Sequence, residues 1–134
     1  MKQFFNGISI YENWQFFDVA PGNIWLIISF LISGFTFSPI SEELFFRGFL
    51  YNALKSRLPI LPASLIQASI FALIHPYRIT GRIEVFLMGI ALVIVYERRK
   101  SLLAPVCVHG LGNAVIFFPL IVLLIQNYHV PAAT

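Results

Sequence analysis

Residues 41–47, SEELFFR, place two adjacent carboxylates and an arginine inside an otherwise apolar part of the chain. Glu43 and Arg47 are four residues apart, so on a helix they share a face and can neutralise each other in low dielectric. Glu42 points about 100° away from its neighbour around the same helix. Its carboxylate is therefore not committed to the arginine and is available for chemistry.

Two further stretches carry an imidazole at helical spacing. FALIH places Phe71 and His75 one turn apart, and HGLGN does the same for His109 and Asn113. A glutamate and a histidine that face each other across helices can deprotonate a water molecule. An imidazole beside an amide supplies hydrogen-bond donors for the oxyanion that forms when that water attacks a carbonyl. The candidate catalytic residues are Glu42, His75, His109 and Asn113, and the candidate supporting residues are Glu43 and Arg47.

The composition indicates that a membrane surrounds these groups. Hydrophobic residues make up 58% of the 134 residues, charged residues 11%, and the mean hydropathy is +0.81. An ordinary soluble domain has roughly 45–50% apolar and about 25% charged residues. The net charge of +3 comes from basic residues at the ends of apolar runs, where the inside-positive bias explains them, so we expect no nucleic-acid partner. We expect an integral membrane protein of the plasma membrane, with the lipid bilayer as its surroundings.

Four apolar runs predict an all-α fold, a polytopic helix bundle that forms a single domain over residues 1–134. Pro39 lacks a backbone N–H and is expected to kink or interrupt the first helix at residues 38–41. The second and third helices are short for a bilayer that needs about 20 residues. After an interfacial lead-in at residues 1–22, the expected helices cover residues 23 to 55–57, the run from Pro59 and Pro62 to His75, about 82–96, and 101 to about 128.

The three polar stretches are expected at a similar depth in the bundle. With about 1.5 Å of rise per residue, Glu42 lies roughly 20 Å from the end of its helix, His75 roughly 20 Å from the start of the next, and His109 roughly 12 Å from the start of the last. Ionisable residues inside membrane helices are functional candidates by default. Three helices that deliver such groups to one level predict a site inside the bundle.

EELFFR matches an EExxxR motif, FALIH matches FxxxH and HGLGN matches HxxxN. In their order and approximate spacing the motifs resemble those of the CPBP family, the CAAX proteases and bacteriocin-processing enzymes, also called Abi or type II CAAX prenyl endopeptidases. The resemblance covers about residues 37–116 and implies an intramembrane glutamic endopeptidase that needs no cofactor. In that pattern Glu42 and His75 activate water. His109 and Asn113 stabilise the oxyanion, and the remaining charged pair of EExxxR holds the site together.

The resemblance leaves the substrate open. CAAX-type processing and the processing of leader or bacteriocin peptides both fit, so the expected partner is a peptide or membrane-protein substrate. Members of the family usually carry more spanning helices ahead of the first motif than this chain does. We therefore expect a minimal form, a truncated form, or a chain that works with a partner subunit or as a homo-oligomer.

Two other functions fit the same residues. Glutamate and histidine ligands suit a zinc-dependent protease, although the HExxH spacing is lacking and Asn113, one turn after His109, is a poor zinc ligand. A non-catalytic bacteriocin self-immunity or membrane scaffold protein of the same fold would use the polar cluster only for interhelical hydrogen bonds. The metal-free protease is the preferred interpretation, and no residue is assigned as a metal ligand.

Overall fold

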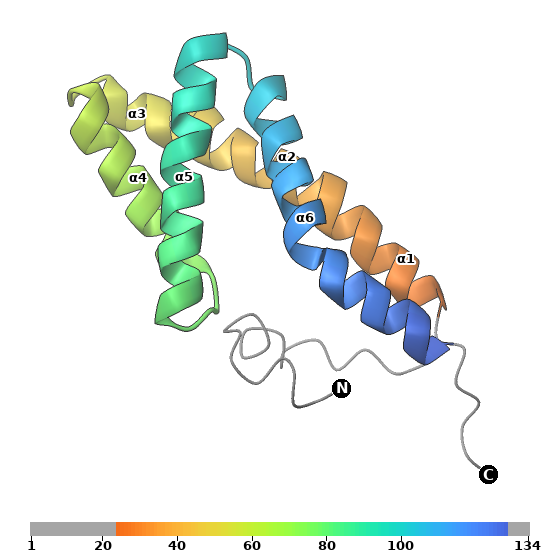
Figure 1. Ribbon diagram of the computed structural model, residues 1–134. Coiled ribbons are helices and arrows are strands. Elements are labelled where there is room, and N and C mark those ends of the chain that lie inside the picture. Colours follow the sequence, from red (N-terminus) through yellow and green to blue (C-terminus); the bar gives the residue numbers. More distant parts are fainter. Residues whose placement is uncertain (1–23, 129–134) are drawn as a thin grey trace.

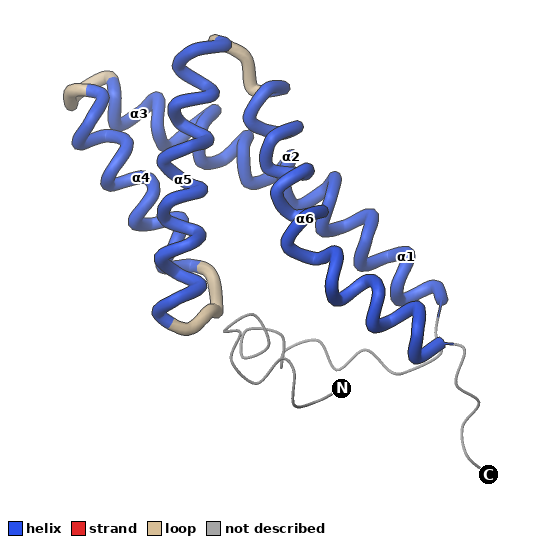
Figure 2. Tube along the Cα trace, viewed as in Figure 1, coloured by secondary structure: helices blue, strands red, loops and turns tan. Residues whose placement is uncertain are grey.

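The computed structural model describes residues 24–128, and every element within this range is a helix. The expected interfacial lead-in at residues 1–22 lies outside the described residues. Four helical runs follow one another along the chain, joined by short loops (Figures 1 and 2). The predicted all-α fold class is confirmed.

The first run is one long helix with two wider turns. It consists of α1 (Ile24–Ile32), the π-helical turn η2 (Ser33–Phe37), α2 (Ser38–Glu43), a second π-helical stretch η3 (Leu44–Tyr51) and α3 (Asn52–Lys55). The residues at each junction keep right-handed helical dihedral angles, so the run continues without a loop. π-helical turns close hydrogen bonds over five residues and are frequent at functional sites.

Pro39 accounts for the first wide turn. Its ring has no N–H and crowds the carbonyl group four residues earlier, that of Phe35. The hydrogen bond just before the proline spans five residues, from the Ser38 N–H to the Ser33 carbonyl oxygen. The irregular turn therefore lies in η2, because a proline disturbs the turn that precedes it. The sequence predicted the irregular turn at residues 38–41.

The other three runs are α4 (Ile60–Ile74), α5 (Ile79–Arg99) and α6 (Leu103–Tyr128). α4 begins directly after Pro59, so that Pro62 lies inside it, and it ends one residue before the predicted end at His75. α5 is longer than predicted at both ends; the polar residues 97–99 continue the helix up to Lys100, whose backbone is left-handed. With 21 residues, α5 alone among the described helices is long and apolar enough to cross a membrane, while α4 and the segment Leu103–Pro119 of α6 are shorter apolar helices. The prediction that the third helix is short was wrong.

The first run connects two pairs of helices. Figure 1 shows α4 and α5 side by side on one flank, and α6 running along α1 and α2 on the other. The η2 and α2 segments contact α6, whereas η3 and α3 contact α4. α5 contacts both α4 and α6. The middle of the first run, α2 and η3, therefore lies between the two pairs.

Small residues let these helices approach closely. A Cβ atom at Gly89 of α5 would lie 3.1 Å from the Cβ atom of Ala68 in α4. A Cβ atom at Gly110 of α6 would lie only 2.7 Å from the carbonyl oxygen of Phe35 in η2. Such close backbone approaches are typical of helix interfaces in membranes.

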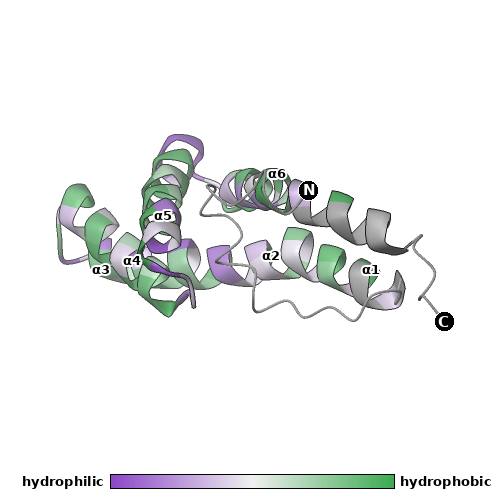
Figure 3. Ribbon diagram, turned by 60° about the horizontal axis from the view of Figure 1, so that its bottom comes forward, coloured by the Kyte–Doolittle hydropathy of each residue, from purple (hydrophilic) through white to green (hydrophobic). Residues whose placement is uncertain are grey.

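The described residues bury polar groups and expose apolar ones. Glu43, Arg47, Gln67 and His109 are buried, while large aliphatic side chains are exposed on α1, α4, α5 and α6. Figure 3 shows hydrophobic residues in every helical run. A soluble protein keeps most charged groups on its surface and aliphatic ones inside. The outer surface of this bundle instead matches the hydrocarbon interior of a bilayer.

We expect Gly110→Ala to lower the melting temperature of the detergent-solubilised protein, because its methyl group would meet a backbone oxygen. Overpacking of this kind costs about 1–3 kcal/mol. Gly112→Ala is the matched control, since a Cβ atom there would meet the flexible end of the Met88 side chain, which can turn away. If Gly110→Ala melts no lower than Gly112→Ala, the close contact of α6 with η2 is wrong.

Candidate active site

A fully buried ion pair joins three of the helical runs. The Glu43 Oε1 atom accepts hydrogen bonds from Arg47 Nη1 and from His109 Nδ1, each at 2.8 Å. Arg47 Nη2 also donates to the carbonyl oxygen of Gly89 at 3.0 Å. Neither side chain of the Glu43–Arg47 pair has exposed surface. The pair thus links the first run to α5 and α6, and each buried charge has a partner.

Phe71 of α4 packs against the arginine and two histidines. The guanidinium carbon of Arg47 lies 4.9 Å from the centroid of the phenyl ring, a cation–π distance. The ring meets His75 and His109 edge-on, with 4.8 Å and 5.9 Å between centroids. This buried side chain therefore fixes α4 against both the charged pair and α6.

The Glu42 carboxylate points in a different direction from that of Glu43, and its two oxygen atoms have different environments. Oε1 accepts a hydrogen bond from the Ser38 hydroxyl group, one turn earlier. Oε2 is buried, has no hydrogen-bond partner among the described residues, and lies 3.8 Å from His75 Nε2 and 3.7 Å from His109 Nε2. These distances exceed a direct hydrogen bond and suit a bridging water molecule.

Hydrogen bonds at the opposite nitrogen fix the orientation of both imidazoles. His75 Nδ1 lies 2.6 Å from the carbonyl oxygen of Phe71, which can only accept, so Nδ1 carries the hydrogen. His109 Nδ1 donates to the Glu43 carboxylate in the same way. The Nε2 atoms of both rings consequently face Glu42.

Asn113 lies one turn after His109 and is held by the first run. Its Nδ2 atom donates to the carbonyl oxygen of Gly34 in η2 at 2.8 Å. This bond leaves the second N–H of the amide group for another acceptor. The wide turn η2 therefore positions the amide that the sequence placed in the site.

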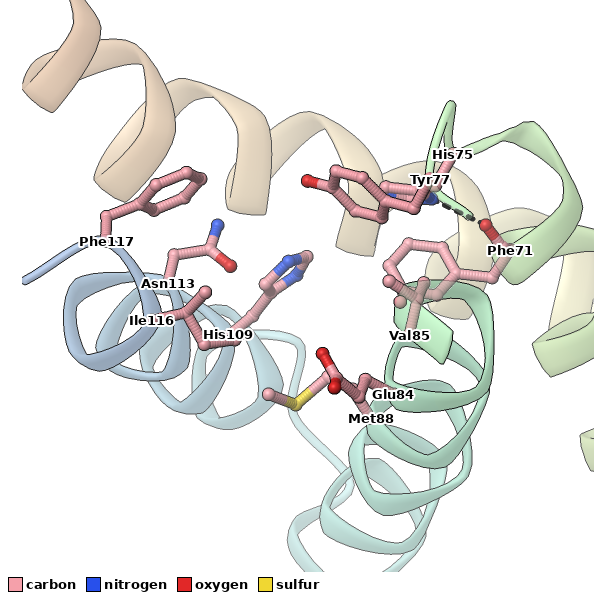
Figure 4. Close-up of a pocket in the computed structure, with 11 residues that line it drawn as sticks. Phe71, His75, Tyr77, Glu84, Val85, Met88, His109, Asn113, Ile116 and Phe117 are labelled. Atoms are coloured by element: carbon pink, nitrogen blue, oxygen red, sulfur yellow. Dashed lines mark hydrogen bonds between the residues drawn. The ribbon is translucent and has the colours of Figure 1, made fainter. Parts of the chain in front are cut away.

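A cavity of about 120 Å³ lies between the loop after α4, α5 and α6, with room for several water molecules. His75, His109 and Asn113 line it together with apolar side chains of α5 and α6 (Figure 4). Glu42 does not line the cavity itself but approaches the two histidines that do. Among the described residues, no group of three His, Cys, Asp or Glu side chains is arranged to hold a metal ion.

The sequence did not predict two residues that approach Glu42. Ser38 could have been found, because it precedes the glutamate by one helical turn. Tyr77 could not, since it lies in the loop after α4, where its backbone N–H donates to the His75 carbonyl oxygen at 2.8 Å. Burial raises the pKa of Tyr77, and the charge of Glu42 raises it further. Its phenol group therefore stays protonated at neutral pH and can donate a hydrogen bond.

Comparison with protein-family models decides the family. The model described as type II CAAX prenyl endopeptidase Rce1-like matches residues 23–115, which include all six candidate catalytic and supporting residues. The chain belongs to this Rce1-like family. Membership implies a CAAX-type protease with a peptide substrate, in a family of membrane proteins. Searches of curated proteins and of solved structures found no match.

Arg47→Ala should destabilise the Rce1-like fold by about 3 kcal/mol or more, because it leaves the Glu43 carboxylate buried without its cation. The melting temperature in detergent measures this loss. Arg57→Ala, at an exposed position after α3, is the control and should change it little. An unchanged melting temperature together with lost activity would instead assign Arg47 to the chemistry.

Proposed function

We propose that this chain is an intramembrane endopeptidase that hydrolyses peptide bonds with an activated water molecule. The observation that supports the proposal most directly is the approach of Glu42 Oε2 to the Nε2 atoms of His75 and His109, at 3.8 Å and 3.7 Å. The three groups come from three different helical runs, and the two histidines line one cavity large enough for water. Because the three side chains approach one another from different helical runs, they are candidates for acting on the same substrate.

Glu42 and His75 together act as the base. A water molecule that donates one hydrogen to Glu42 Oε2 and the other to His75 Nε2 presents a lone pair to an incoming carbonyl carbon. Transfer of a proton to the carboxylate, as the new O–C bond forms, makes the water nucleophilic at neutral pH. The resulting carboxylic acid then gives this proton to the departing amine nitrogen as the C–N bond breaks, which restores the initial state.

His109 and Asn113 act as donors to the oxyanion. His109 Nδ1 donates to the Glu43 carboxylate, so the imidazole has to carry a hydrogen on both nitrogens when Nε2 donates to the oxyanion. The free N–H of the Asn113 amide is the second donor. Because Glu43 and Gly34 hold these donors in position before the reaction, little reorganisation is needed in the transition state.

The peptide substrate belongs to one of two classes. CAAX-type substrates end in a prenylated cysteine followed by three residues, and the description of the family names prenyl endopeptidases. Leader or bacteriocin-type peptides form the second class. A farnesylated CAAX reporter peptide and its unprenylated counterpart, assayed in parallel, distinguish the two.

Two competing functions would give other results with these peptides. A non-catalytic immunity or scaffold protein would bind a peptide and cleave none. A metal-dependent protease would need Glu42, His75 and His109 as ligands, and among the described residues no group of three such side chains is arranged to hold an ion. Metal-free catalysis is preferred because an amide, Asn113, occupies the position one turn after His109 where a zinc protease would use another ligand.

Glu42→Gln is expected to lower cleavage of the reporter peptide by at least about 100-fold, the contribution of a general base. The melting temperature should stay close to that of the wild type, since the amide has the same size and still accepts the bond from Ser38. Retention of more than about a tenth of the wild-type rate would contradict this role for Glu42. The same assay with a strong chelator separates the mechanisms, because only a metal-dependent enzyme loses activity and regains it when zinc is restored.

Asn113→Ala should lower kcat by about 100-fold or more, because an oxyanion donor acts on charge that develops only in the transition state. Binding of a fluorescent, uncleavable reporter peptide should remain close to wild type. Equal losses of binding and of rate would indicate that Asn113 instead shapes the cavity through its bond to Gly34.

A further inference from the structure

One acidic residue of the cavity has no part in the proposed chemistry. Glu84 of α5 lines the same cavity as His75, His109 and Asn113. Among the lining residues it is the one with a formal negative charge at neutral pH. Figure 4 shows its carboxylate group between α5 and α6, beside the Met88 side chain.

The charge of Glu84 is not compensated within the described part of the chain. The other glutamates there each accept at least one side-chain hydrogen bond. Glu42 accepts one from Ser38, and Glu43 accepts two, from Arg47 and His109. Glu97 accepts hydrogen bonds from Lys55 and Lys100. Glu84 has no hydrogen bond or ion pair of this kind in the same residues. It is also an exposed residue, so its carboxylate can be reached from the cavity.

The surroundings of Glu84 make an opposite charge its best partner. Val85, Met88, Ile116 and Phe117 line the cavity around it with apolar surface. In such a site of low dielectric, the attraction between a carboxylate and a cation is stronger than in water. An ionisable residue in a membrane bundle that has no partner of its own is a candidate for binding a ligand.

We propose that Glu84 determines substrate specificity by binding a lysine or arginine side chain of the peptide close to the bond that is cleaved. This inference rests on the proposed endopeptidase function. Because the cavity is only about 120 Å³, a carbonyl group held at His109 and Asn113 lies near Glu84. Successive residues of an extended peptide are about 3.3 Å apart, so the cation would be within one or two residues of the cleaved bond.

The test compares pairs of N-acetylated, farnesylated CAAX reporter peptides that differ by lysine or norleucine at one position. The substituted positions are the two residues on either side of the cleaved bond, except the prenylated cysteine, and acetylation removes the competing terminal amine. For at least one position, we expect the wild type to show a kcat/KM at least about tenfold higher for lysine, as a charge-assisted hydrogen bond allows. Glu84→Gln should bring this ratio to within about twofold of one, and Glu84→Lys should favour a glutamate peptide over the lysine peptide.

Glu97→Gln is the matched control, because it removes the same charge from the same helix roughly 20 Å away, outside the cavity. It should keep the wild-type ratio. Each ratio is measured within one protein preparation, so a change in the amount of folded protein does not affect it. Equal cleavage of both peptides by the wild type at every position, or an unchanged ratio in Glu84→Gln, overturns the role of Glu84 alone. A wild type that cleaves no peptide overturns the proposed function as well, and with it this inference.

Discussion

Burial of the Glu43–Arg47 pair is the constraint on which the rest of the site depends. Moving two charges out of water costs several kcal/mol for each ion unless hydrogen bonds satisfy them. Here the remaining partners are the Gly89 carbonyl oxygen on α5 and the His109 imidazole on α6. These two hydrogen bonds form only when the first run, α5 and α6 have come together. One of the pair's partners is the candidate catalytic residue His109. The hydrogen bond that holds α6 against the first run therefore also orients this imidazole.

The same constraint gives two adjacent carboxylates different environments. Glu43 accepts hydrogen bonds from Arg47 and His109, both at Oε1, while its Oε2 atom has no hydrogen-bond partner among the described residues. Glu42 receives one hydrogen bond, at Oε1 from Ser38, and directs Oε2 toward the Nε2 atoms of His75 and His109. Neighbouring carboxyl groups whose surroundings differ in this way can take separate roles, one structural and one in proton transfer. A single residue of offset along a helix is sufficient, because it turns the side chain by about 100°.

Helical spacing and hydropathy predicted the parts of this structure that depend on one element at a time. They gave the four runs, their proline boundaries, and the contact of Arg47 with Glu43. They did not give the contacts with the carbonyl oxygens of Gly89 and Gly34, because any residue offers a carbonyl and the spacing does not say which faces meet. The length of α5 was missed for a related reason. Its charged last turn, residues 97–99, ends the hydrophobic run but not the helix.

Features that look separate in the sequence act together at the contact between η2 and α6. Pro39 cannot donate to the Phe35 carbonyl group and widens the turn before it. Gly110, lacking a Cβ atom, allows α6 to approach that carbonyl group more closely than any other residue would. One turn of α6 beyond this contact, Asn113 reaches the carbonyl oxygen of Gly34, the neighbour of Phe35. A proline in one helix and a glycine in another thus set the position of the amide beside the cavity, although neither has a functional group of its own.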